Sequence, residues 1–157
     1  MPNFEHKYAE LLRAALNQTP RQTRNAITRG YFGDSLVTNA LYFDELPLLQ
    51  GRKLYWKGVV GELAAFLRGP KFIEDFQDMG CNYWNAWSDT LGTINVDYGN
   101  AWLDFNGVNQ LEEVVNSLKT DPYGRRHLIS GWRPDKLKTL SLPCCHYSYQ
   151  WYVNNDN

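Results

Sequence analysis

Apolar side chains recur at helical spacing in two long stretches of the chain. The first covers residues 4–17 and is followed by Pro20, and the second covers residues 55–68 and stops at Gly69 and Pro70. Side chains three and four positions apart share one face of a helix, so both stretches are predicted to be amphipathic helices. The apolar positions are Phe4, Tyr8, Leu11, Leu12, Ala15 and Leu16 in the first, and Val59, Val60, Leu63, Phe66 and Leu67 in the second.

Two shorter helices are predicted further along. Residues 72–79 show the same spacing, and Gly80 closes that segment because glycine readily adopts the backbone conformation that ends a helix. Residues 111–118 show it again. The second of these helices is expected to stop at Asp121, because a residue before proline disfavours helical backbone.

Strands are predicted mainly in the second half of the chain. Residues 127–132 form one, and residues 146–154 form another whose aromatic side chains alternate onto one face. A polar loop over residues 21–30 is expected to lead into a strand that starts at residues 30–33. Residues 82–89 are predicted to be a polar, aromatic loop.

Composition limits the class of protein without identifying it. The chain has 157 residues, of which 43% are hydrophobic and 21% charged, as in a soluble globular domain that occupies residues 1–157. A formal net charge of −1 argues against DNA or RNA binding by a basic surface. We find no membrane-spanning run and no signal peptide.

The cysteines and histidines point to a reducing compartment without a metal site. There are three cysteines, two of them adjacent, which does not make a disulfide framework, so the expected location is the cytoplasm. The histidines have no ligand spacing with the cysteines, so no metal is expected.

The strongest candidate for chemistry is the adjacent pair Cys144 and Cys145, directly before the last predicted strand. Pro143 stiffens the chain before the pair and His146 follows it, which is typical of a strained, partly exposed turn. A deprotonated thiol presented there is a strong carbon nucleophile. Neighbouring side chains point different ways, so only one of the two thiols is expected to serve. The alternative is that both are inert core thiols.

Two other residues are placed for proton transfer. Glu62 lies beside the apolar stripe of the helix predicted over residues 55–68, where partial burial raises a carboxyl pKa and lets the group order water. Its alternative is a solvated residue at the rim of the helix. Tyr98 precedes Gly99, so a ligand can approach its phenol closely, although packing alone also explains a tyrosine there.

Arginines supply candidate phosphate ligands. Arg125 and Arg126 follow a predicted turn, and Arg24 lies on the polar loop over residues 21–30. Forked guanidinium donors suit phosphate, although adjacent exposed arginines also form plain solvated patches. No glycine-rich phosphate loop occurs, so a bound phosphate would be held by side chains.

Taken together, a series of segments resembles thymidylate synthase and the related deoxypyrimidine-nucleotide hydroxymethylases of bacteriophages. The order and spacing of the segments carry the resemblance, which runs through nearly the whole chain. The segments are Tyr31-Phe32-Gly33 after the Arg24 loop, Pro47-Leu48-Leu49, residues 61–69, residues 84–89, residues 98–102, residues 121–127, Trp132-Arg133-Pro134, residues 142–146 and residues 150–153.

The resemblance implies an α+β fold with a mixed, largely antiparallel sheet and helices on one face. It implies reductive methylation of dUMP to dTMP, with 5,10-methylenetetrahydrofolate as co-substrate. Cys145 would be the nucleophile that adds to C6 of the pyrimidine, and Glu62 would organise water and proton transfer. Tyr98 would lie near the C5 proton, while Trp84 and Trp87 would lie beside the folate.

The same resemblance implies how the nucleotide is held. Arg24 would bind phosphate in its own subunit, and His146 would contact the substrate. Arg125 and Arg126 would reach the phosphate in the neighbouring subunit's site, which requires a homodimer.

Several positions depart from the family pattern. Cys144 stands where proline is common and Gly61 where histidine is common, whereas Ala65, Gly124 and Arg133 replace tryptophan, serine and asparagine.

The end of the sequence bears on what the chain does by itself. It stops just after the predicted catalytic strand, so we expect a truncated or split protein whose isolated chain turns over no nucleotide. The aromatic strand over residues 146–154 is then expected to pair either with an earlier strand or with a segment from outside the chain. Two alternatives to a synthase stay open: a dUMP or dCMP hydroxymethylase, and an inactive fragment or binding module.

Overall fold

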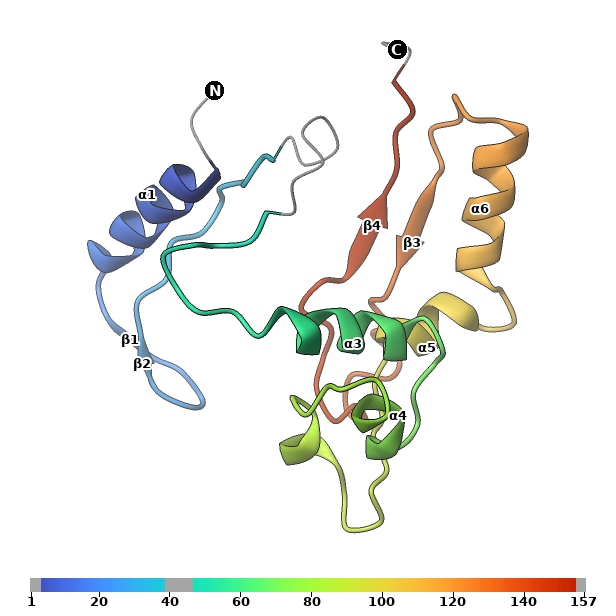
Figure 1. Ribbon diagram of the computed structural model, residues 1–157, viewed down its shortest axis with the longest axis horizontal. Helices are drawn as coiled ribbons and strands as arrows, with labels where there is room; N and C mark the ends of the chain where they lie inside the picture. Colours follow the sequence, from blue (N-terminus) through green and yellow to red (C-terminus); the bar gives the residue numbers. More distant parts are fainter. Residues whose placement is uncertain (1–3, 39–46, 155–157) are drawn as a thin grey trace. The chain divides into compact units, whose positions relative to one another are not determined.

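A computed structural model describes residues 4–38 and 47–154, and the chain divides into two compact units, Met1–Leu54 and Tyr55–Asn157 (Figure 1). The first unit contains helix α1 (Phe4–Leu16), which confirms the helix predicted over residues 4–17. A hairpin of two short antiparallel strands follows, β1 (Arg21–Gln22) and β2 (Ile27–Thr28). None of the described residues of this unit is fully buried.

The structure of the first unit differs from two of the sequence predictions. The polar stretch over residues 21–30 is a hairpin rather than a loop, because its turn is closed by the Thr23 amide, which donates to the Ala26 carbonyl at 2.9 Å. The strand expected at residues 30–33 is absent from the described structure. Gly33 has a φ of +88°, which breaks extended backbone, and the Phe32 side chain is 98% exposed, so it has no sheet to pack on.

The second unit begins with two helices that pack on each other, α3 (Trp56–Phe66) and α4 (Ile73–Gln77). Both confirm predicted helices. The face of α3 that enters the core consists of Gly58, Gly61, Ala65 and Phe66. A methyl group on Gly61 would lie 2.1 Å from the Met79 carbonyl oxygen, so only glycine permits this close approach.

Of the predicted apolar stripe of α3, only Phe66 lies on the buried face of the helix. Val59, Val60, Leu63 and Leu67 are all between 45% and 56% exposed. Small residues decide the orientation here, because they allow the helix to approach the backbone beyond α4.

Two further helices cover the middle of the second unit. Helix α6 (Gln110–Thr120) confirms the helix predicted over residues 111–118, and the Asn109 side chain caps it by accepting from the Glu112 amide at 3.1 Å. Helix α5 (Tyr98–Leu103) was not predicted, although Tyr98, Ala101 and Trp102 have helical spacing and are buried. The loop predicted over residues 82–89 contains the short 3-10 helix η1 (Asn85–Trp87).

Strands β3 (Leu128–Ser130) and β4 (Ser148–Gln150) pair antiparallel, with Ile129 opposite Tyr149. A backbone hydrogen bond continues the pairing at each end, from Trp151 to His127 and from Gly131 to Tyr147. Both strands were predicted but are shorter than expected. The last strand thus pairs with an earlier strand of the same chain, one of the two arrangements expected for it.

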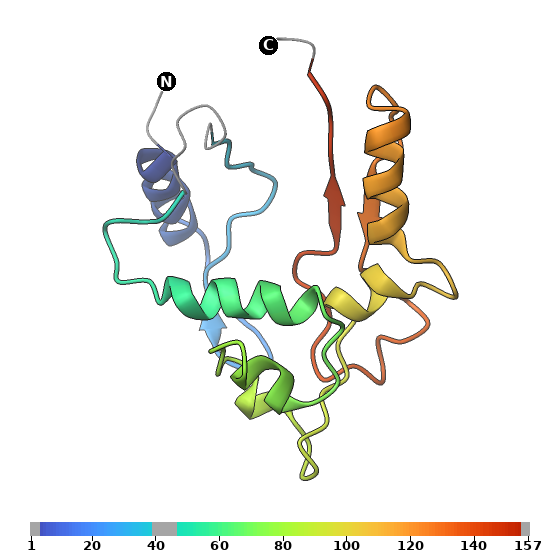
Figure 2. The same cartoon turned by 45° about the vertical axis from the view of Figure 1, so that its right-hand side comes forward.

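Helices α5 and α6 both pack against β3, and α6 runs alongside it in both views (Figures 1 and 2). The α+β class is confirmed, and all strand pairs between described strands are antiparallel. The core of this unit lies among α3, α4, α5 and β3. Its buried hydrophobic members are Ala65, Phe66, Ile73, Phe76, Cys81, Trp84, Ile94, Val96, Tyr98, Trp102, Val114, Ile129 and Cys144.

Candidate active site

The two adjacent cysteines have different environments. Cys145 is exposed, whereas Cys144 is 7% exposed and its thiol donates to the Gly131 carbonyl oxygen at 3.3 Å. The Cys145 backbone amide donates to the Tyr98 hydroxyl at 2.7 Å. The turn before β4 therefore presents one thiol to solvent and holds the other against β3.

Tyr98 connects that turn to the core. It is the first residue of α5, is 3% exposed, and stacks on Phe66 with ring centroids 4.6 Å apart. Burial raises the pKa of its phenol well above the usual range, so the hydroxyl keeps its proton at neutral pH. It can accept from the Cys145 amide and still donate to a ligand or water.

His146 lies beside the same phenol. Its ring centroid is 4.3 Å from that of Tyr98, and its Nδ1 forms a hydrogen bond with the Tyr149 hydroxyl. Burial lowers the pKa of the His146 imidazole, which favours the neutral ring. Burial, followed by electrostatic repulsion from Cys144 and Glu62, raises the pKa of Tyr149 to about 12.

Glu62 lies on α3 and is partly buried. The Trp84 indole N–H donates to its Oε1 at 2.7 Å. Burial raises the pKa of Glu62, and the bond from Trp84 opposes this only in part. The structure therefore matches the interpretation of a partly buried carboxyl group and not that of a solvated rim residue.

The two tryptophans differ in what they offer a ligand. Trp84 is 4% exposed, stacks on Phe76 at 5.3 Å and lies 5.8 Å from Tyr98, so its ring is a core element that holds Glu62. Trp87, in η1, is 36% exposed and presents ring surface to solvent. Of this pair, Trp87 has the exposed aromatic face that a planar pterin needs.

The predicted phosphate ligands belong to both units of the chain. Arg125 and Arg126 are exposed, and the two surface hollows near them do not include Cys145 in their walls. One hollow of about 130 Å³ is lined by Pro122, Tyr123, Gly124, Tyr152 and Val153. The other, of about 310 Å³, is lined by Val108, Gln110, Glu113, Val114, Ser117, Arg126 and Leu128. Arg24 belongs to the first unit, at the tip of the hairpin, where its Nε donates to Asn25 at 3.2 Å.

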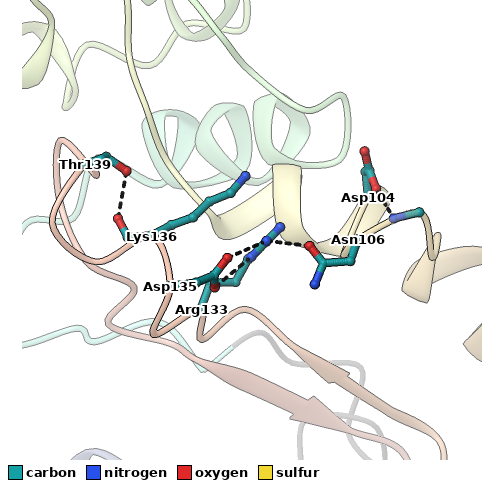
Figure 3. A network of polar contacts seen from close by, with 7 residues as sticks. Asp104, Asn106, Arg133, Asp135, Lys136 and Thr139 are labelled. Carbon is teal, nitrogen blue, oxygen red and sulfur yellow. Dashed lines mark hydrogen bonds and ion pairs between the residues drawn. The ribbon is translucent and has the colours of Figure 1, made fainter.

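A polar network fixes the loop that leads to the cysteines (Figure 3). Arg133 is 5% exposed and donates to Asn106 at 2.7 Å and to Asp135 at 2.8 Å. Its guanidinium lies 4.7 Å from the centre of the Phe105 ring. The family departure at position 133 is thus a buried cation with partners of its own.

Sequence reasoning missed three residues that shape this cluster. Phe66 stacks on Tyr98, and Tyr149 binds His146. Asp97 is 3% exposed, and its Oδ2 has no hydrogen-bond partner in the part of the chain that the structure describes. Burial raises the pKa of Asp97, while Lys136 and Arg133 oppose this. The helical spacing of Tyr98, Ala101 and Trp102 was the available signal for α5, whereas nothing in the sequence marked Asp97.

Residues 4–38 and 47–154 offer neither a membrane-spanning helix nor a metal site. No helix among them is long and apolar enough to cross a membrane. No three or more of their His, Cys, Asp and Glu side chains are grouped to hold a metal ion.

Three similar proteins all have thymidylate synthase in their names. A protein called thymidylate synthase from Mycoplasma pneumoniae is 29% identical, over 95% of this chain and 62% of its own length. A "probable thymidylate synthase" of Escherichia phage T5 is 36% identical, over 70% of this chain and 45% of its own length. A thymidylate synthase of Corynebacterium aurimucosum is 34% identical, over 96% of this chain and 58% of its own length.

The chain thus spans 45% to 62% of the length of these relatives. The family model described as thymidylate synthase matches residues 6–157, which include every residue of the cluster around Cys145. This chain belongs to the thymidylate synthase family.

Proposed function

We propose that this chain carries the nucleophile and the proton-transfer groups of a cytoplasmic thymidylate synthase-type methyltransferase that converts dUMP to dTMP. The observation that carries the proposal is the exposed Cys145, whose amide is bound by Tyr98. His146 and the Glu62–Trp84 pair adjoin that tyrosine through ring contacts. Free, reduced cysteines are compatible with the cytoplasm.

The reaction begins at the sulfur of Cys145. The thiolate adds to C6 of the pyrimidine, which makes C5 nucleophilic, and the same sulfur leaves C6 when the ring double bond re-forms. Covalent attack divides one difficult step into easier ones. Methylenetetrahydrofolate supplies the one-carbon unit and the hydride when it is bound.

Glu62 and Tyr98 handle protons. A raised pKa lets a carboxyl group hold and return a proton more readily than an exposed one, so Glu62 acts through ordered water on the pyrimidine. Tyr98 keeps its own proton and orients the water that takes the proton from C5. Its bond to the Cys145 amide fixes the sulfur relative to this water.

The arginines bind the nucleotide phosphate. Arg125 and Arg126 are exposed, and the family resemblance assigns them to the phosphate in the site of a second copy within a homodimer. Arg24 serves the phosphate of its own subunit, and His146 contacts the nucleotide. The exposed ring of Trp87 covers the pterin, while Trp84 acts by holding Glu62.

Product analysis tests the function. The chain is assayed alone and with a polypeptide that supplies the part of the Corynebacterium aurimucosum relative that this chain does not match. Each sample receives methylenetetrahydrofolate with dUMP or dCMP. We expect dTMP from dUMP in the completed assembly and no product from the chain alone. A 5-hydroxymethyl nucleotide as the sole product would replace the synthase with a hydroxymethylase, and nucleotide binding without any product would make the chain a binding module.

A further inference from the structure

Gly131 forms hydrogen bonds to both ends of the turn that carries Cys145. Its carbonyl accepts from the Cys144 thiol at 3.3 Å, and its amide donates to the Tyr147 carbonyl at 2.7 Å. Cys145 and His146 are the two residues between these anchor points. The bond to Tyr147 joins two backbone groups and does not depend on the side chain there. The bond from Cys144 depends on the side chain at position 144.

The Cys144 thiol is buried beside Gly131 and helix α5. An atom added at the Cβ position of Gly131 would lie at an ordinary contact distance, 3.6 Å, from both the Cys144 sulfur and the Trp102 indole nitrogen. Cys144 is 7% exposed and its thiol is bonded to the Gly131 carbonyl, whereas Cys145 is exposed, so the two thiols have different environments. The two adjacent thiols do not act as a pair.

The charge state of Cys144 suits a hydrogen-bond donor. Burial, followed by electrostatic repulsion from Asp97 and Cys145, raises the pKa of the Cys144 thiol to about 11. The group is thus an S–H at neutral pH and can donate to the Gly131 carbonyl. Proline, which the family resemblance makes common at this position, has no such donor.

We propose that Cys144 is a positioning residue, whose thiol hydrogen bond to Gly131 fixes the turn that brings the Cys145 amide to the Tyr98 hydroxyl. Its consequence for turnover rests on the proposed function, but its effect on the turn does not. A proline would make this turn rigid through its ring. Here a side-chain hydrogen bond to Gly131, directly after β3, has that function instead.

Amide hydrogen exchange tests the proposal without turnover. The readout is the exchange rate of the Cys145 amide in Cys144→Ala, compared with the Trp151 amide, which donates to His127 in the β3–β4 pairing. We expect the Cys145 amide to exchange about tenfold faster, which corresponds to loss of one hydrogen bond, while the Trp151 amide changes little. In Cys144→Ser the hydroxyl can donate in place of the thiol and should restore slow exchange.

Cys81→Ala is the matched control, because it removes another buried thiol from the same unit. It should destabilise the core without a selective effect at Cys145. The proposal is wrong if Cys144→Ala accelerates both amides equally, or neither, or if Cys144→Ser behaves like Cys144→Ala.

A second measurement applies if Cys144→Ala does not fold. The S–H stretching band of the unsubstituted chain should contain a component shifted to lower frequency than a free thiol, and this component should vanish in Cys144→Ser. Absence of the shifted component would overturn the proposal. In the completed enzyme, Cys144→Ala should lower kcat with little change in the KM for nucleotide. Exchange results as expected with no turnover in any sample would leave the role of Cys144 standing and reject the proposed function.

Discussion

The Tyr98 hydroxyl is the contact through which the core of the second unit holds the turn that carries Cys145. The hydroxyl accepts from the Cys145 backbone amide, so it fixes the position of the Cys145 thiol before the reaction. This bond to the backbone does not set the reactivity of the sulfur. The ring beneath it is fixed by the stack on Phe66. A side-chain bond to a partly buried backbone donor contributes to stability as well as to geometry, because the donor is costly to leave unpaired.

Replacement of Tyr98 by phenylalanine removes only that acceptor. We expect Tyr98→Phe to lower the free energy of unfolding by about 1–2 kcal/mol, measured by denaturant titration. Tyr83→Phe is the control, because its hydroxyl also makes one bond, to the Tyr55 carbonyl at 2.9 Å, but the residue is 44% exposed. Equal losses in the two variants would show that the Tyr98 bond has no special role.

The pH dependence of stability tests the environment of Glu62. Burial raises its folded-state pKa, so its contribution to stability is present below the unfolded pKa and is lost as the pH rises through the folded pKa. Glu62→Gln does not ionise. The variant should therefore gain stability relative to the unsubstituted chain as the pH rises above the ordinary glutamate pKa of about 4.3. Denaturant midpoints across this rise in pH measure the effect, with the exposed Glu113→Gln as control. A constant difference at all pH values would contradict the assignment.

Part of the environment of single site residues could be predicted from the sequence. The proline-led turn predicted the exposure of Cys145. Glu62 is partly buried as predicted, but not because of the apolar stripe beside it, most of which is exposed. The bond from Trp84 to Glu62 and that from Arg133 to Asn106 did not follow from the sequence, since each joins residues more than twenty positions apart along the chain.

At the scale of elements, close backbone approaches decide how the helices pack. A methyl group on Gly99 would lie 1.5 Å from the Phe66 carbonyl oxygen, so α5 begins in direct contact with the end of α3. Apolar periodicity predicted α3 itself, but the pattern marked Val59, Val60 and Leu63, which are exposed. Apolar periodicity is insensitive to glycine, which is why it identified only Phe66 of the buried face of α3.

Substitution of Gly99 tests this packing. Gly99→Ala places a methyl group into the Phe66 backbone and should lower the free energy of unfolding by more than about 3 kcal/mol or prevent folding. Gly131→Ala is the control, since a methyl group there would meet its nearest neighbours at 3.6 Å, an ordinary contact distance. Thermal unfolding measured by circular dichroism compares the two. Similar melting temperatures would mean that α3 and α5 do not approach as described.

At the scale of the whole molecule, the proposal divides the site between two copies of the chain. Cys145 and its neighbours belong to one copy, while Arg125 and Arg126 serve the other. This division is a prediction from the family resemblance. The residues alone indicated only that Arg125 and Arg126 are either a phosphate site or a solvated patch.

Mixing two inactive variants tests the division. In a dimer of Cys145→Ser with Arg126→Ala, one of the two sites contains both the native thiol and the native arginine. After equal amounts of the two variants exchange subunits in the completed assembly, half of the dimers are mixed. Each mixed dimer has one intact site of two, so we expect about a quarter of the unsubstituted activity. If Arg126 instead served its own subunit, every site would be damaged and no activity would return.

Tritium release from 5-tritiated dUMP measures the central claim most directly, because the C5 hydrogen is lost only after a nucleophile has added at C6. In the completed assembly with methylenetetrahydrofolate, the unsubstituted chain should release tritium. Cys145→Ser should release it at least about a thousandfold more slowly, because the serine hydroxyl is a far weaker nucleophile than a thiolate. Release by Cys145→Ser at a rate close to that of the unsubstituted chain would contradict the account.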